Sequence, residues 1–127
     1  YMIPYGQHKV TQADINEVIA ILQSDFLTQG PVVPKFETAL ATYGGASKAV
    51  LADSATSALH IACLALGLGP NDVMWTSANS FVASANCGLY CGATVDFIDI
   101  DPNTYNISID QLQAKLAKAE IEGNLPK

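Results

Sequence analysis

The sequence predicts an α/β fold, with a mainly parallel β-sheet that carries helices on both faces. From about residue 46 onward, short apolar runs of strand length alternate with longer apolar runs of helical length. The Gly-Pro-Asn-Asp stretch at 69–72 separates one helical run from the next strand-like run. Half of the 127 residues are apolar and only 14% are charged, which favours a buried core over disorder. Strands that alternate with helices form βαβ units, whose strands are parallel.

We divide the chain into an arm with helices at 1–45 and a βαβ core at 46–127. In the arm, Thr11 is a predicted N-cap with an acidic residue, Asp14, three positions later. The helix that follows should end near Ser24, and its apolar residues fall at helical spacing. These residues are Ile15, Val18, Ile19 and Leu22. A second helix is expected from about Pro34 to Tyr43, because the pair Gly44-Gly45 would end it.

In the core, the alternation predicts three strands and three helices. Ser108 is the expected N-cap of the last helix. The expected strands are 49–53, 73–77 and 94–98, and the expected helices are 57–67, about 80–90 and roughly 108–120. A sheet of three strands would have an open edge, which favours dimerisation or strand exchange.

Composition excludes some classes of function. The net charge is −6, from twelve acidic residues against six lysines, and the chain has no arginine. A sparse acidic surface argues against nucleic acid or an anionic membrane as a main partner. No uncharged apolar run approaches the roughly 18 residues that a membrane span needs. We therefore expect a cytoplasmic protein.

The cysteines indicate a reducing compartment. Cys63, Cys87 and Cys91 are an odd set without C-x-x-C spacing, and they lie in patterns of apolar or small residues. We expect buried thiols. Neither a histidine nor a further cysteine lies at zinc-ligand spacing, so no metal site is predicted.

The stretch Ser54-Ala55-Thr56-Ser57 is the predicted anion site. It joins a strand-like run to a helix-like run. The first N–H groups of a helix lack internal partners, and the helix dipole favours negative charge there. The alternative is an ordinary Ser/Thr helix cap without a ligand.

Other residues that can contact a ligand follow the strands or lie in a loop. Ligands of open parallel sheets collect at the carboxyl ends of strands, which here are 53–56, 77–81 and 99–101. Phe81 would provide an aromatic platform beside the phosphate, or else simply a core side chain. The loop 25–31 contains a Phe, a Thr and an amide next to each other, and it is either a binding loop or only a turn.

Five segments in order resemble sugar aminotransferases of the DegT/StrS type, which use pyridoxal 5'-phosphate (PLP). The likeness is strongest to members that aminate a UDP-linked 4-keto-6-deoxy-N-acetylhexosamine on the way to pseudaminic acid. It extends over essentially the whole chain. The segments are Ile3-Pro4-Tyr5-Gly6, 25–31, 53–60, Trp75 to Phe81 and Val95 to Asp101.

The resemblance implies roles for particular residues. Ala55 and Thr56 match positions that hold the PLP phosphate, and Phe81 matches the aromatic that stacks on the cofactor ring. Tyr5 and the loop residues match positions that line the nucleotide-sugar site, often at a homodimer interface. These loop residues are Asp25, Phe26, Leu27 and Thr28. The implied fold is part of the large domain of the aspartate aminotransferase-like PLP-dependent transferases.

The resemblance also implies the chemistry, with glutamate as the amino donor and a nucleotide-linked ketosugar as the acceptor. The lysine that holds PLP as a Schiff base is expected beyond Lys127, as is the carboxylate that pairs with the ring nitrogen. None of the six lysines present is therefore predicted to be catalytic. Ala78 and Ser80 replace a Pro and a Thr that relatives commonly have before the aromatic residue.

Several functions remain open at this point. The first is a PLP-dependent transaminase, of which this chain is an N-terminal part that is inactive alone. The second is a binding domain that keeps the phosphate site without the catalytic lysine, and the third is a regulator derived from the same fold. PLP enzymes of this fold that act on amino acids are a fourth, although we expect them to lack the loop 25–31.

Overall fold

The computed structural model describes residues 3–4 and 6–127, and it divides the chain into two compact units. The first unit is Tyr1–Leu51 and the second is Ala52–Lys127. Each unit is described by itself.

The first unit contains two helices, α1 (Gln12–Leu22) and α2 (Val32–Gly44). Thr11 caps α1 as predicted: its hydroxyl accepts from the Asp14 N–H, and the Asp14 carboxylate accepts from the Thr11 N–H at 2.7 Å. The end of α2 also confirms the prediction. Gly45 has a φ of 66°, a left-handed conformation that glycine adopts without strain, and its N–H bonds to carbonyls of the last turn.

The prediction of a strand at 49–53 is wrong, because these residues form no strand in the structure. A strand needs a neighbour for its backbone groups, and these residues find none on a sheet. Instead, the Leu51 N–H donates to the Glu37 carboxylate on α2 at 2.8 Å, and the Val50 side chain is 76% exposed. The apolar composition of this run therefore did not indicate whether it pairs with another strand.

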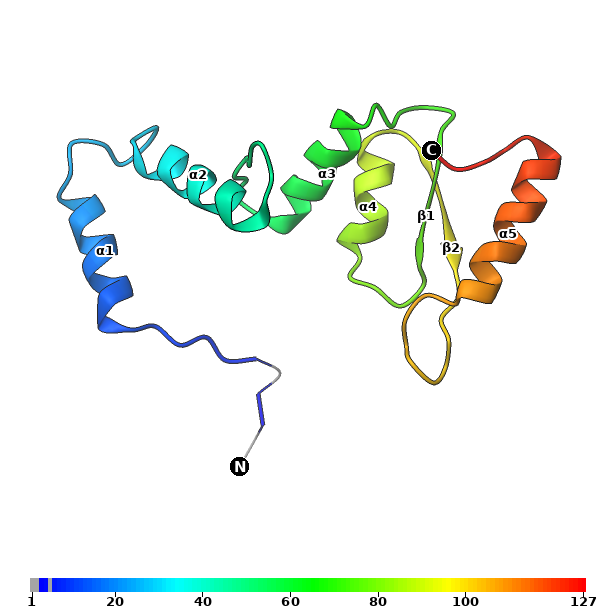
Figure 1. The fold of residues 1–127 in the computed structure, drawn as a ribbon, viewed down its shortest axis with the longest axis horizontal. Helices are drawn as coiled ribbons and strands as arrows, with labels where there is room; N and C mark the ends of the chain where they lie inside the picture. Colours follow the sequence, from blue (N-terminus) through cyan, green and yellow to red (C-terminus); the bar gives the residue numbers. More distant parts are fainter. Residues whose placement is uncertain (1–2, 5) are drawn as a thin grey trace. The chain divides into compact units, whose positions relative to one another are not determined.

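The second unit is a parallel two-stranded sheet with helices (Figure 1). Along the chain it comprises α3 (Ala55–Ala65), β1 (Val73–Ser77), α4 (Ala83–Tyr90), β2 (Thr94–Ile98) and α5 (Ile109–Glu122). Both strands agree with the predicted ranges, and the three helices begin or end within a few residues of theirs. Ser108 caps α5 as predicted, because its hydroxyl accepts from the Gln111 N–H.

One face of the sheet is covered by α4. The strands pair in register from Val73 with Thr94 to Ser77 with Ile98. Gly88 of α4 approaches so closely that an added Cβ would lie 2.8 Å from the Met74 side chain and 2.9 Å from that of Val95. Such an approach requires a residue without a side chain. Gly88 therefore sets how closely α4 packs on the two strands.

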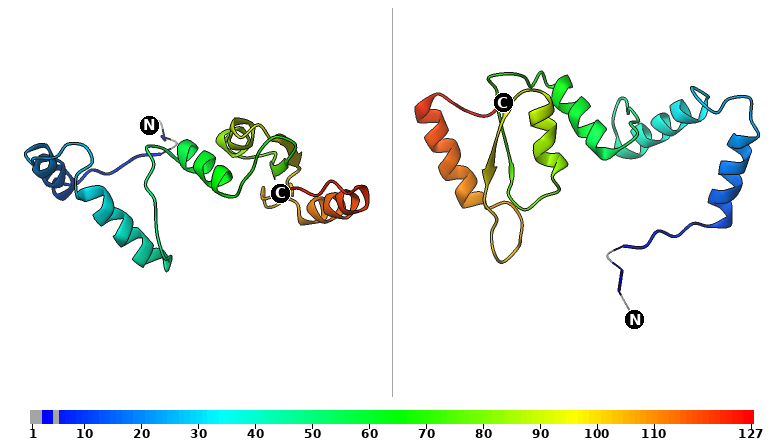
Figure 2. Two further views of the ribbon diagram at one scale, coloured as in Figure 1. Left: turned by 90° about the horizontal axis from the view of Figure 1, so that it is seen from above. Right: turned by 180° about the vertical axis from the view of Figure 1, so that it is seen from behind.

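Lys115 anchors helix α5 to the sheet, because it contacts Trp75 of β1 and Asp96 of β2, which lie side by side in the strand pairing. The Lys115 ammonium lies 2.6 Å from the Asp96 carboxylate and 5.0 Å from the centre of the Trp75 ring. It also donates to the Phe97 carbonyl at 2.7 Å. Because successive strand side chains point to opposite faces, Trp75 and Asp96 lie on the face away from Gly88. Figures 1 and 2 show the strands between α4 and α5, so the predicted helices on both faces are confirmed.

The core of the second unit is small, and it lies where α3 and α4 meet the ends of the strands. Leu68, Cys91 and Ala93 form its buried cluster, with Cys63 and Met74 packed against them. Other buried side chains are those of Ala83, Cys87, Ile98 and Ala119. Among the helices in the described part of the chain, none is long and apolar enough to cross a membrane.

Candidate functional site

The first turn of α3 has the geometry of an anion site. Ser54 is its N-cap, with an extended backbone, and the Ser54 hydroxyl accepts from the Ser57 N–H at 3.2 Å. The Ser54 carbonyl accepts from the Ala58 N–H, which closes the first intrahelical bond. Ala55 and Thr56 occupy the two positions between, so helix geometry leaves their N–H groups without partners inside the helix. Thus the predicted helix cap is present, and two backbone donors remain beside it.

Exposure is consistent with ligand access at this turn. Ala55 is exposed and Thr56 is half-buried. Ala55 has no side chain beyond Cβ that would shield its own N–H, and Thr56 adds a hydroxyl to the two N–H donors. The donors and the N-terminal end of the α3 dipole together favour an oxyanion.

Asp53 places a negative charge next to this turn. Its pKa is lowered, chiefly because the Ser57 hydroxyl bonds the carboxylate, with a smaller contribution from Ser54. Asp53 is therefore ionised at neutral pH and already stabilises the start of α3. A bound phosphate would meet this charge, which weakens the attraction of the turn for anions. The sequence pattern included Asp53 but did not indicate this electrostatic effect.

Phe81 lies between β1 and α4, one residue before the N-cap Val82. Its side chain is 75% exposed, so it is not the core residue that we considered as the alternative. With Phe97 and Thr76 it lines a small cavity of about 170 Å³ after the end of β1. Figure 1 shows α3 and α4 side by side, with the first turns of both helices toward the same end of the unit. The phosphate turn and the aromatic residue thus start two adjacent helices.

The predicted sugar loop lies in the first unit, between α1 and α2. The side chains of Asp25, Phe26, Leu27 and Thr28 are all exposed. The Ser24 hydroxyl donates to the Ile21 carbonyl and lies 3.2 Å from the Phe26 carbonyl, so it supports the start of the loop. A Cβ on Gly30 would lie 2.9 Å from the Phe26 Cβ, which explains the glycine. Tyr5, the remaining predicted sugar-site residue, lies outside the described residues.

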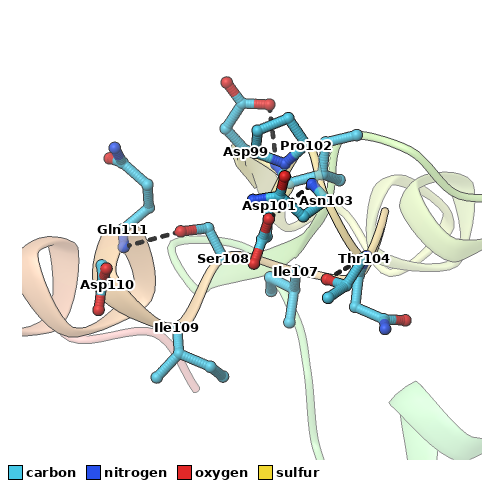
Figure 3. A pocket seen from close by; sticks show the side chains of 12 residues that line it. Asp99, Asp101, Pro102, Asn103, Thr104, Ile107, Ser108, Ile109, Asp110 and Gln111 are labelled. Carbon is cyan, nitrogen blue, oxygen red and sulfur yellow. Dashed lines mark hydrogen bonds between the residues drawn. The ribbon is translucent and has the colours of Figure 1, made fainter.

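The third predicted strand end, at Asp99 and Asp101, forms a loop in which both carboxylates accept hydrogen bonds from the backbone. The Asp99 carboxylate accepts from the Ile100 N–H at 2.8 Å, and that of Asp101 accepts from the Asn103 N–H at 2.7 Å. Ile100 pairs with Ile107 across the loop in an antiparallel bridge. Figure 3 shows the cleft, of about 710 Å³, between this loop and the start of α5. Both acids are thus used to hold the loop in shape.

Comparison with known proteins places this geometry in a family. The model of the DegT/DnrJ/EryC1/StrS aminotransferase family matches residues 8–120. The chain belongs to this family.

Two curated relatives show how much of a family member the chain represents. It is 43% identical over 117 residues to UDP-4-amino-4,6-dideoxy-N-acetyl-beta-L-altrosamine transaminase of Campylobacter jejuni, covering 92% of the chain and 31% of the relative. It is 40% identical over 114 residues to the spore coat polysaccharide biosynthesis protein SpsC of Bacillus subtilis, covering 90% and 29%. The chain therefore spans about three-tenths of the length of these relatives.

Solved structures of aminotransferases confirm the fold class. A Streptococcus pneumoniae protein assigned as a sugar aminotransferase, in its PLP form, aligns with a TM-score of 0.83 and 33% identity, over 90% of this chain and 29% of that one. The aminotransferase TlmJ of Streptoalloteichus hindustanus aligns with a TM-score of 0.76 and 31% identity, over 91% and 32%. The two units described here are thus part of an α/β aminotransferase domain.

The residues of the α3 turn fit the cofactor of this family. A phosphate is bound well by paired backbone N–H groups and a hydroxyl at a helix start, which Ala55 and Thr56 provide without any arginine. An exposed aromatic at the start of the adjacent helix suits a flat ring. The Asp53 carboxylate is the one feature of this turn that opposes the fit.

The lysines of the second unit are all engaged in other contacts. Lys115 is bound to Asp96, Lys118 lies 3.7 Å from the Glu122 carboxylate, and Lys127 lies 3.0 Å from that of Asp72. Each of these carboxylates belongs to a strand start, a strand face or a helix end away from the α3 turn.

Proposed function

We propose that this chain is the cofactor-phosphate and sugar-loop part of a PLP-dependent transaminase that aminates a nucleotide-linked 4-ketosugar. The observation that carries the proposal is the α3 turn, where Ala55 and Thr56 offer two N–H groups without helical partners in a member of the sugar aminotransferase family. The Campylobacter jejuni relative, named for a UDP-linked amino sugar, supports a UDP-sugar as the substrate class. The proposed amino donor is glutamate, and the proposed setting is amino-sugar synthesis for surface glycans in the cytoplasm, by a homodimer.

In this proposal each residue has a limited task. The N–H groups of Ala55 and Thr56, with the Thr56 hydroxyl, bind the phosphate, and Phe81 supports the face of the cofactor ring. When bound, PLP supplies the electron sink for amino transfer. Tyr5 and the residues of loop 25–28 contact the nucleotide sugar.

The proton-transfer lysine is proposed to come from beyond Lys127, so the chain alone binds but does not transaminate. This separates the proposal from the alternative of a binding or regulatory domain. In that alternative, the same phosphate turn serves a protein that has no catalytic lysine at all. Glutamate-dependent amination of a UDP-4-ketosugar by the complete gene product supports the enzyme, whereas tight ligand binding without turnover favours the alternative.

The phosphate turn is tested by equilibrium titration of the purified chain with PLP and, as a matched control ligand, with pyridoxal. Thr56→Ala should weaken the binding of PLP severalfold and leave pyridoxal unchanged, because only the phosphate contacts this turn. Phe81→Ala should weaken both, because both contain the ring. Asp53→Asn should tighten the binding of PLP but not of pyridoxal, since it removes a negative charge from the site where the phosphate binds.

Thr42→Ala, on the exposed side of α2, is the matched threonine control, because its hydroxyl bonds only the Thr38 carbonyl of its own helix. If Thr56→Ala and Thr42→Ala bind PLP equally well, the assignment of the phosphate turn is wrong. Borohydride reduction provides a second check. Covalent attachment at a single lysine of this chain would contradict the position proposed for the catalytic lysine.

A further inference from the structure

The three thiols of the chain lie together where α3 packs on α4. Cys63 is on α3, and Cys87 and Cys91 are one helical turn apart on and just after α4. Cys63 packs against the buried cluster that includes Cys91. Cys87 is 3% exposed, and its thiol donates weakly to the Ser84 carbonyl within α4. Neither the proposed transamination nor the cofactor turn uses any of these thiols.

Cys63 packs against the cluster that contains Cys91, and both other thiols influence its pKa. The pKa of Cys63 is raised to about 11, chiefly by burial, with smaller contributions from the neighbouring thiols of Cys87 and Cys91. Ionisation of a thiol that lies beside other ionisable thiols is disfavoured, because two thiolates would place negative charges close together. Cys63 is also the half-buried member of the set, whereas Cys87 and Cys91 are buried. It is therefore the thiol that a small reagent reaches first.

We propose that these thiols are an oxidation site, in which Cys63 closes a disulfide with Cys87 or Cys91 and thereby links α3 to α4. The oxidant class is a hydroperoxide. With hydrogen peroxide, the Cys63 thiolate attacks one peroxide oxygen and the O–O bond breaks, which gives a sulfenic acid and a hydroxide that takes up a proton to become water. The neighbouring thiol then attacks that sulfur, which forms the S–S bond and releases a second water molecule.

The link would join the two helices whose first turns hold the candidate phosphate turn and Phe81. Oxidation therefore fixes the relative position of α3 and α4 without changing any cofactor-contacting residue. The inference does not depend on the proposed transamination, because it concerns only the packing of these two helices.

The rate of the reaction has a predictable pH dependence. The thiolate is the nucleophile, so a raised pKa slows the first step at neutral pH. Because the pKa of Cys63 is about 11, its thiolate fraction increases roughly tenfold with each unit by which the pH rises, as long as the pH stays below that pKa. Loss of Cys63 thiol to hydrogen peroxide should therefore be about a hundredfold faster at pH 9 than at pH 7.

The test is oxidation of the purified chain with hydrogen peroxide, alkylation of the remaining thiols, and peptide mapping without reduction. Trypsin is unsuitable, because no lysine or arginine lies between Lys48 and Lys115 and all three cysteines stay in one peptide. Cleavage before aspartate separates Cys63 in peptide 53–71 from the other two cysteines in peptide 72–95. The proposed disulfide joins these two peptides within one chain, with the loss of two hydrogen atoms.

Variants identify the partner and control for misfolding. Cys63→Ala should abolish the link, as should Cys87→Ala combined with Cys91→Ala, while one of the two single variants on the α4 side should retain it. Circular dichroism of each variant shows whether the helices persist. Three outcomes overturn the inference: Cys63 oxidised beyond sulfenic acid with no link, a Cys87–Cys91 bond inside peptide 72–95, or a link that appears only in urea.

Discussion

The two units of this chain differ in how far their helices pack against other parts of the structure. In the first unit, both helices form with their predicted caps, yet Ala41 is the one buried side chain among the residues that the structure describes there. In the second unit, a glycine contact, an ion pair and a buried cluster hold helices against strands. The first unit is thus stabilised mainly by local interactions, and the second also by packing.

The difference shows that helix caps and helical spacing can specify a helix without specifying what buries it. The stripe Ile15, Val18, Ile19 and Leu22 has helical spacing, but every one of these side chains is more than 40% exposed. Capping and spacing are enough to specify a helix, because their interactions span only three or four residues. Burial requires a second surface, and an isolated helix of 11 residues is marginal without one.

Gly88→Val gives the largest expected effect and tests the packed unit. The added side chain would overlap Met74 and Val95, so the free energy of unfolding should fall by about 1–3 kcal/mol. Urea unfolding followed by the fluorescence of Trp75, the only tryptophan, measures this loss. The matched control is Gly44→Ala at the end of α2, where an added Cβ would meet nothing within 4 Å. Equal midpoints for Gly88→Val and the unmodified chain would contradict the close packing of α4.

Lys115→Met should have the next largest effect, of about 1–2 kcal/mol. It removes a contact with an aromatic ring, a charged hydrogen bond and an ion pair, of which the partly exposed ion pair contributes least. Lys118→Met is the control on the same helix, because the Lys118 side chain is 74% exposed. If both substitutions shift the urea midpoint equally, Lys115 does not anchor α5.

Thr11→Ala should cost about 1 kcal/mol, but only within the first unit. It removes the hydroxyl that accepts from the Asp14 N–H and leaves the bond from the Thr11 N–H to the Asp14 carboxylate, so α1 should lose helicity in far-ultraviolet circular dichroism. The urea midpoint reported by Trp75 should not move, because that residue belongs to the second unit. Thr11→Ser keeps the hydroxyl and is the conservative control. A shift of the Trp75 transition by Thr11→Ala would show that the two units unfold together.

Asp96→Asn should have the smallest effect, a few tenths of a kcal/mol at neutral pH. The Lys115 ammonium lowers the pKa of Asp96, with help from the Phe97 N–H. A carboxyl group with a lowered pKa in the folded state adds stability above its unfolded pKa and loses it as pH falls through the folded pKa. The difference between Asp96→Asn and the unmodified chain should therefore begin to shrink near the ordinary aspartate pKa of about 4, and it should disappear once the pH is below the lowered pKa of the folded state. A difference that persists at lower pH would exclude the ion pair as its cause.

Interactions over short sequence distances were predictable here, and those over long distances were not. The Thr11 and Ser108 caps and the Gly45 helix end depend on residues close in sequence, and all three were found as expected. The run 49–53 is apolar like a strand, but a strand is defined by a partner that no local pattern reveals. The contact of Lys115 with Asp96 joins residues in different elements, and no periodicity signals it.

The candidate site follows the same rule. Ala55 and Thr56 lie in the first turn of α3, which begins two residues before the predicted helix because Ser54 is its cap. The exposure of Phe81 was undecided in the sequence, since an aromatic after a strand suits either a core or a surface. The Asp53 charge was visible, but its bond with Ser57 depends on how the turn folds.

The parallel pairing of β1 with β2 also has a consequence for the order of folding. Each pair of partners in this register is separated by about twenty residues, so closing the connection through α4 costs little chain entropy. Contacts of such short range form early, and they can nucleate the remaining structure. During synthesis, β1, α4 and β2 can therefore assemble as soon as Ile98 has left the ribosome, before α5 has emerged to cover Trp75.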